Sequence, residues 1–328
     1  MAGTNREEGA LKRWLSRTGQ LVLTVAVTWF IVDRVGLDLV GLGGLGPETW
    51  LPDPLLFSGA SVLLLAAYFV SAGLWGLIVR ELGGPALPTV DAIRLFMIAN
   101  LGRYLPGKVW QIAGLAALAK GRGVPAMTAT GAAVLGQGIS LVAASAVGMG
   151  AFLAGPEQFR RWGVLGAALV GGLIVLVSVP PVFARLAGLW FRLSRTEPQH
   201  GLASVHGLRW LGLYVLNWVM YALAFWVLSL SLGLEAGLVP VASAFAAAYA
   251  LGYVMIFAPA GLGPREGFLI IFLTPHFGAT SSGVIAVVAR LWTTLVELVP
   301  AGLFWMRHVA SHRVTLPEGS NGSGGGGS

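Results

Sequence analysis

The stretch N-L-G-R-Y-L-P-G-K-V-W-Q (Asn100–Gln111) places two cations, a proline and several polar groups between apolar runs of the chain. Charge is costly at such a position in a very hydrophobic protein, because lipid cannot replace the hydration of a cation. Proline interrupts a helix, since it lacks a backbone N–H and clashes with the preceding turn. We therefore interpret this segment as a break that serves a function.

A second break of the same kind lies near the C-terminus. The stretch P-A-G-L-G-P-R-E-G (Pro259–Gly267) again combines prolines and glycines with charged residues, and long apolar segments again flank it. We interpret the two breaks as counterparts, and the functional hypothesis depends on this pairing.

The composition predicts an integral membrane protein. Of the 328 residues, 56% are hydrophobic and 11% charged, and the mean hydropathy is +0.78. Soluble domains carry roughly a quarter charged residues. The uncharged runs lack the alternation of a membrane barrel, so the fold class is all-α and polytopic. The net charge is +7, and the cations lie mostly in short loops beside these runs. This placement indicates contact with anionic lipid rather than nucleic acid.

Charge and hydropathy predict about six full spans with both termini in the cytoplasm. We read the first apolar run as a retained helix rather than a signal peptide, and the basic segment from Arg185 to Arg209 as the strongest cytoplasmic anchor. The predicted spans are Thr18–Val32, Pro54–Val79, Gly123–Pro156, Gly163–Ala184, Trp210–Leu234 and Ser282–Trp305.

Two shorter segments predict re-entrant helical hairpins. The run Val109–Ala119 gives only ~16 Å of helix, about half of the ~30 Å hydrocarbon core. The second break likewise precedes a short apolar segment that ends at Pro275. The order span, hairpin, span occurs over residues 54–156 and again, in opposite orientation, over 210–306, which predicts an inverted repeat. We expect one membrane domain over residues 1–318, followed by a flexible linker of Gly, Ser and Asn over 319–328.

The first break predicts an anion site. Arg103 and Lys108 flank Pro106-Gly107, so a bend there would direct two cations and free backbone N–H groups toward one point. Asn100 and Gln111 flank the bend as neutral hydrogen-bonding groups. The competing interpretation is that both cations reach the cytoplasmic interface and bind no ligand.

Other chemistries find little support in the sequence. Gly102–Lys108 fits the G-x-x-x-x-G-K pattern of a nucleotide-binding loop, but Val109 stands where Ser or Thr should hold magnesium, and no strand precedes it. His308 and His312 have metal-ligand spacing but no carboxylate partner. We therefore predict no enzyme, catalytic residue, cofactor or metal, and transport that runs downhill or is coupled to an ion gradient.

Four further charged residues leave two interpretations open. Arg265 and Glu266 either neutralise each other or separate, with Glu266 meeting a cation in the other half of the chain and Arg265 facing the substrate. Arg290 and Glu297 share one face of the last helix, where they either pair structurally or act in gating.

The two breaks together resemble the transmembrane, flippase-like domain of lysylphosphatidylglycerol synthases and its stand-alone relatives, over about residues 55–307. The resemblance implies movement of aminoacylated phosphatidylglycerol or polyprenyl-phosphate-linked sugars between leaflets. Ala260 stands where many relatives have Gly, and no aminoacyl-transferase domain follows residue 313, so we expect no synthesis of lysyl-lipid. The residues that the resemblance marks as functional are Arg103, Pro106, Gly107, Lys108, Gly261, Gly263, Arg265 and Glu266.

The sequence thus predicts a flippase of the bacterial plasma membrane that moves an anionic lipid. Arg103, Lys108 and Arg265 would bind the head group, while Glu266, Arg290 and Glu297 gate or pair. Pro259, Gly261 and Gly263 would form the second break as Pro106 and Gly107 form the first. The alternatives are a membrane enzyme that acts on a lipid-linked substrate and a scaffold that docks a separate synthase or glycosyltransferase.

Overall fold

The computed structural model describes residues 51–104, 109–154, 204–255 and 263–313, together with isolated positions between 160 and 192. Every regular element within these residues is helical, as the composition predicts. The elements are α3 (Pro54–Glu81), α4 (Thr89–Asn100), the 3-10 turn η2 (Leu101–Tyr104), α5 (Trp110–Lys120), α6 (Ala126–Ala154), α9 (Ser204–Ser231), α10 (Leu238–Val254) and α11 (Pro264–Arg313).

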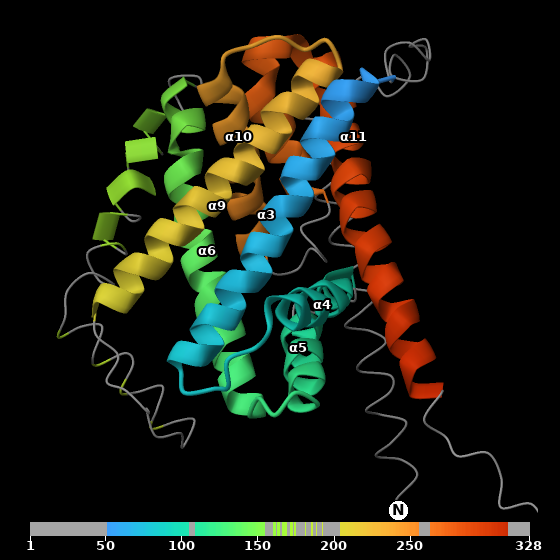
Figure 1. Ribbon diagram of the computed structural model, residues 1–328. Helices are drawn as coiled ribbons and strands as arrows, with labels where there is room; N and C mark the ends of the chain where they lie inside the picture. The colour runs from blue at the N-terminus through green and yellow to red at the C-terminus, as the bar shows by residue number, and fades with distance from the viewer. Residues whose placement is uncertain are drawn as a thin grey trace, which may run out of the picture.

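Four of these helices, α3, α6, α9 and α11, are long and apolar enough to cross a membrane. They correspond to the predicted spans 54–79, 123–156, 210–234 and 282–305. The predicted span 18–32 lies outside the described residues, and 163–184 lies mostly outside them. Helices α3 and α9 pack against each other along the centre of the molecule (Figure 1). The chain is therefore a multi-pass helical membrane protein.

Two pairs of shorter segments complete the bundle. Helices α4 and α5 have 12 and 11 residues, too few to span, and η2 connects them where the first break is predicted. The 17-residue α10 precedes the second break, and Gly278, with φ of 75°, interrupts α11 beyond it. In Figure 1, α4 and α5 lie at the lower end of the molecule and α10 lies toward the upper end.

Glycines permit the backbone to approach itself closely at both breaks. A Cβ on Gly102 would lie 2.8 Å from the backbone N of Gln111, at the start of α5. A Cβ on Gly252 would lie 3.0 Å from the Cα of Arg265, at the start of α11. Both distances are shorter than such contacts normally allow, so each break holds the end of one short helix against the start of the next.

Helix α10 is buried mainly through small side chains. Its fully covered residues include five alanines, a serine and a glycine within one stretch of ten residues. It packs against α6, where a Cβ on Gly148 would lie 2.6 Å from the backbone N of Ala247. Small residues allow helices in lipid to approach closely, because dispersion contacts replace the hydrophobic effect there.

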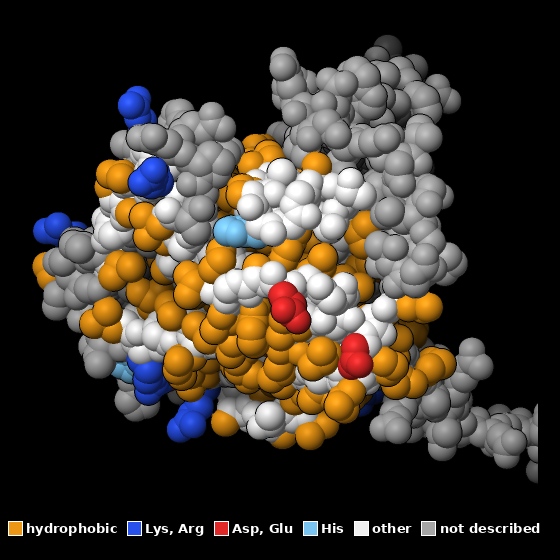
Figure 2. Space-filling view, turned by 90° about the horizontal axis from the view of Figure 1, so that it is seen from above, with side chains coloured by type: hydrophobic (Ala, Val, Ile, Leu, Met, Phe, Trp, Pro, Cys, Tyr) orange, Lys and Arg blue, Asp and Glu red, His pale blue; other side chains and the backbone are white. Residues whose placement is uncertain are grey.

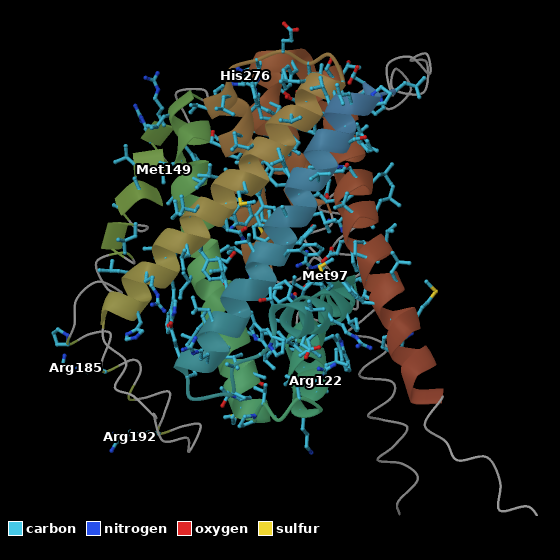
Figure 3. The ribbon with its side chains drawn as sticks, viewed as in Figure 1. Met97, Arg122, Met149, Arg185, Arg192 and His276 are labelled. Carbon is cyan, nitrogen blue, oxygen red and sulfur yellow. The ribbon has the colours of Figure 1, made fainter. Side chains whose placement is uncertain are left out.

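Basic residues gather at one end of the bundle. In Figure 3, Arg122, Arg185 and Arg192 lie toward the lower end, whereas His276 lies at the upper end. Arg122 pairs with Asp91, and Glu81 pairs with Arg209. Seen from above, the described surface is mostly apolar or uncharged; acidic side chains lie near its centre and Lys or Arg side chains along its left edge (Figure 2).

Candidate functional site

A cavity lies inside the bundle where the two breaks meet the long helices. It encloses about 940 Å³ of empty space, including the part that opens outward. Its charged and polar lining comprises Ser71, Asn100, Arg103, Gln111, Gln137, Ser140, Arg265, Thr293 and the tyrosines Tyr68, Tyr214, Tyr221, Tyr249 and Tyr253. An adjoining pocket shares Arg103, Gln111 and Arg265 and adds Tyr104, Arg290 and Glu297. The cavity is thus built from residues of both predicted half-repeats.

The first charged group of the cavity joins the first break to the last helix. The Nη1 atom of Arg103 in η2 lies 3.3 Å from Oε1 and 3.4 Å from Oε2 of Glu297 in α11. The hydroxyl of Tyr104 donates to Oε2 of Glu297 at 2.9 Å. Glu297 is only 1% exposed, whereas the Arg103 side chain is 25% exposed. A buried carboxylate needs such partners, because its charge has lost its hydration.

The second charged group lies within α11. Oε2 of Glu266 accepts a hydrogen bond of 2.8 Å from the backbone N of Gly263, which caps the first turn of the helix. Oε1 of the same carboxylate lies 3.6 Å from Nη1 of Arg290. Glu266 therefore pairs with a cation of its own helix, not with one in the other half of the chain as one of the two sequence interpretations expected. Arg290 and Glu297 share a helix face as predicted, but the ion pairs that they form reach Glu266 and Arg103.

Arg265 faces the cavity without a carboxylate partner among the residues that the structure describes. Its guanidinium carbon lies 4.9 Å from the ring centre of Phe245 and 5.6 Å from that of Tyr249, both in α10. These cation–π contacts hold the side chain over aromatic faces but do not neutralise its charge. No hydrogen bond joins the guanidinium of Arg265 to another described residue, so its N–H groups could bind an anion that enters the cavity.

Asn100 and Gln111 close the first break from both sides. Nε2 of Gln111, in the first turn of α5, donates to Oδ1 of Asn100, the last residue of α4, at 2.6 Å. Asn100 is fully buried, and its Nδ2 has no hydrogen-bond partner within the described part of the chain. Buried amide groups are nearly always paired, so this donor marks a position where a ligand or water would bind.

The structure brings together six of the residues that the sequence singled out: Asn100, Arg103, Gln111, Arg265, Arg290 and Glu297 line the cavity or its adjoining pocket. Glu266 and Gly263 line neither pocket, but they are bonded to each other, and Glu266 pairs with Arg290 of the adjoining pocket. Lys108, Pro106, Gly107, Pro259 and Gly261 lie outside the described residues.

Sequence reasoning missed the aromatic part of the site. Tyr104 lies within the quoted first break and bonds to Glu297, yet it was not among the residues singled out there. The tyrosines of α3, α9 and α10 follow no motif; the signal that could have found them is a phenolic hydroxyl in the middle of an apolar span.

Among the described residues, no three His, Asp or Glu side chains lie close enough together to hold a metal ion. A search of curated proteins finds no match to this chain. The family model described as the lysylphosphatidylglycerol synthase TM region matches residues 17–301, most of the chain. The match covers both breaks and part or all of every helix that lines the cavity, and it ends within α11, shortly before the end of the predicted inverted repeat. The chain therefore belongs to the family of lysylphosphatidylglycerol synthase transmembrane regions.

Proposed function

We propose that the protein translocates an anionic lipid between the leaflets of the bacterial plasma membrane. The observation that carries this proposal is Arg265, a cation that faces an internal cavity and has no carboxylate partner among the described residues. A half-buried charge inside a membrane bundle is expensive and is usually matched by a ligand or an ion pathway.

Three features of the cavity suit a phosphate. Arg265 and Arg103 supply guanidinium groups, which match phosphate oxygens in geometry and charge. The buried Nδ2 of Asn100 supplies an unpaired neutral donor. Gln111 and Arg265, the second residues of α5 and α11, line the same cavity, so the N-terminal ends of both helices lie beside it and their dipoles favour negative charge there.

The pair between Arg103 and Glu297 provides a way to keep charge balanced when the cavity is empty. In the structure Glu297 holds Arg103 at 3.3 Å, and the carboxylate carries the same negative charge that a lipid phosphate would bring. A phosphate that replaces Glu297 on Arg103 leaves the carboxylate with its hydrogen bond from Tyr104. Exchange of one anion for another then distinguishes the loaded cavity from the empty one.

Transport follows if the opposed hairpins expose this cavity to each leaflet in turn while the lipid tails remain in the bilayer. In this proposal α4 and α5 form a hairpin that enters from the cytoplasm, and α10 and the first part of α11 form one that enters from outside. Both termini are cytoplasmic, and the basic end of the bundle in Figure 3 faces inward. The protein transports rather than transforms its lipid, which a separate synthase or glycosyltransferase would supply.

Reconstituted protein is expected to move labelled phosphatidylglycerol across the bilayer much faster than labelled phosphatidylcholine. The two lipids differ in net charge, and the cavity has cations but no free carboxylate among its described lining residues. The measurement is the fraction of a fluorescent lipid that an impermeant quencher reaches in phosphatidylcholine vesicles over time. Protein-free vesicles give the background rate.

Equal rates for the anionic and the zwitterionic lipid would contradict the proposal, because a non-selective scramblase needs no buried arginine. Lipids extracted after the assay should keep their mass. A change in mass would instead show an enzyme.

The hairpins themselves can be tested by labelling single cysteines, because the chain contains none of its own. Ala86→Cys and Lys120→Cys flank α4 and α5, and both should react with an impermeant maleimide from the cytoplasmic side. Glu235→Cys and Thr280→Cys flank the second hairpin and should react from the outside. Labelling of Ala86→Cys and Lys120→Cys from opposite sides would show a full span and rule out the first hairpin.

A further inference from the structure

All six tyrosines of the chain line the same internal space. The larger pocket contacts Tyr68, Tyr214, Tyr221, Tyr249 and Tyr253, and the adjoining pocket contacts Tyr104. Tyrosine in a membrane protein is enriched at the two lipid–water interfaces, where its hydroxyl reaches the head groups. Phenylalanine, which fills apolar space equally well, is represented in the described lining by Phe96 and Phe245. The placement of tyrosine therefore reflects a need for hydroxyl groups in the cavity.

We call the part of the cavity formed by Tyr68, Gln137, Ser140, Tyr214, Tyr221 and Tyr249 the tyrosine chamber. Its residues come from α3, α6, α9 and α10, so it extends from the charged groups of the two breaks into the bundle of long helices. It includes none of the charged residues of the cavity. It is therefore a polar but uncharged extension of the proposed phosphate site.

Several polar atoms of the chamber are not used by the protein. Tyr68 and Tyr214 are buried, with exposed fractions of 7% and 5%, yet neither hydroxyl makes a hydrogen bond with another described residue. The Tyr249 hydroxyl accepts only a long hydrogen bond of 3.4 Å from Gln137. Tyr221 is better matched, since its hydroxyl lies 3.0 Å from Oγ of Ser71. Hydroxyl groups that line a cavity and have no partner among the described residues can bind a ligand that forms hydrogen bonds.

The charge of the lining decides which polar group fits. Arg103 and Arg265 are the charged residues that line the larger pocket within the described part of the chain, and both are cations. The only described carboxylate of the adjoining pocket, Glu297, already binds Arg103 and Tyr104. The aromatic faces of Phe245 and Tyr249 are occupied by Arg265. An ammonium group, such as that of an aminoacylated lipid, would therefore be repelled and would find no free partner.

We propose that the tyrosine chamber binds the neutral, hydroxyl-rich part of a lipid head group whose phosphate lies at Arg265 and Arg103. This inference rests on the proposed function and narrows its substrate to phosphodiesters that carry a polyol. Aromatic walls and a few convergent hydroxyl and amide groups suit such a group, because they contact its C–H faces and its hydroxyls together. Two sources share this chemistry, a phosphatidyl-polyol and a prenyl-phosphate-linked sugar.

The test is a panel of labelled lipids in phosphatidylcholine vesicles that contain the full chain. Neutral hydroxylated groups are present in phosphatidylglycerol, phosphatidylinositol and a prenyl phosphoglucose. Phosphatidic acid and prenyl phosphate have no such group. Lysyl-phosphatidylglycerol carries ammonium groups. We expect the hydroxylated lipids to move about tenfold faster than the bare phosphates, as two hydrogen bonds of ordinary strength would give. Lysyl-phosphatidylglycerol should move more slowly than phosphatidylglycerol. Faster movement of the phosphatidyl lipids or of the prenyl phosphoglucose shows which of these two lipid classes the cavity prefers.

Tyr68→Phe combined with Tyr214→Phe removes two hydroxyls and keeps both rings, so the variant should fold. We expect it to lose the preference for hydroxylated lipids, so that the ratio of their rates to the rate for phosphatidic acid falls toward one. An equal loss for every lipid would show a structural role and overturn the proposal. Wild-type rates for phosphatidic acid or lysyl-phosphatidylglycerol that match those of the hydroxylated lipids would also overturn it, with the proposed function intact. If no anionic lipid moves at all, the proposed function itself fails.

Discussion

Replacement of Arg265 by alanine is expected to abolish the transport of anionic lipid while the protein remains folded. The side chain forms no ion pair with a described carboxylate, so its removal leaves no buried charge without a partner. A hydrogen bond to a charged group contributes about 1.5–3 kcal/mol, and its loss alone lowers phosphate binding by about 10- to 150-fold. The measurement is the initial rate of phosphatidylglycerol translocation by equal amounts of reconstituted protein.

Arg122→Ala is the matched control for this prediction. Arg122 is also an arginine, but it is exposed at the end of the bundle and pairs with Asp91, where an ion pair contributes little to stability. It should transport at the wild-type rate. Arg265→Lys keeps the charge but loses the planar guanidinium, so an intermediate rate is expected. Full activity of Arg265→Ala would remove the observation on which the proposed function depends.

Disruption of the pair between Arg103 and Glu297 is expected to lower stability and transport by separate routes. Arg103→Met leaves the buried carboxylate of Glu297 with Tyr104 as its remaining described partner. Loss of one member of a buried ion pair costs about 3–5 kcal/mol, so the apparent melting temperature in detergent should fall by several degrees. The double variant Arg103→Met with Glu297→Leu removes both charges and should recover most of that stability.

The double variant separates a structural role of the pair from a role in transport. If Glu297 exchanges with the lipid phosphate on Arg103, the double variant should fold well and still move phosphatidylglycerol at least about tenfold more slowly than the wild type. Wild-type transport by the double variant would show that the pair only stabilises the bundle. Melting curves and translocation rates from the same preparations give both results.

Much of the helical arrangement could be predicted from the sequence because hydropathy and helix breakers act locally. The run before Arg80 predicts α3, and the short run after Lys108 corresponds to α5, which ends at Lys120. Gly278 interrupts α11 close to Pro275, where the second short apolar segment was predicted to end. Such features depend on neighbours along the chain, and lipid imposes a length on each apolar run.

The pairing of charges could be predicted only in part. Spacing placed Arg290 and Glu297 on one face of a helix, but it could not show that residues 194 positions apart, Arg103 and Glu297, would meet. That contact depends on how η2 packs against α11, which no local pattern encodes. The tyrosines were missed for a related reason: hydropathy treats a lone tyrosine in an apolar run as an interface residue, and only the assembled bundle shows that Tyr68 and Tyr214 face inward.

The alanine-rich surface of α10 has a mechanical consequence. Large side chains interlock, so a helix that carries them can move past its neighbour only when rotamers change. Methyl groups and glycines, such as Ala247 and Gly148 at the contact with α6, present a smooth surface with no rotamers to change. Shear between such helices meets little friction. We expect the bundle to slide at α10, and the cation–π contacts of Arg265 with Phe245 and Tyr249 of that helix would decide where the sliding stops.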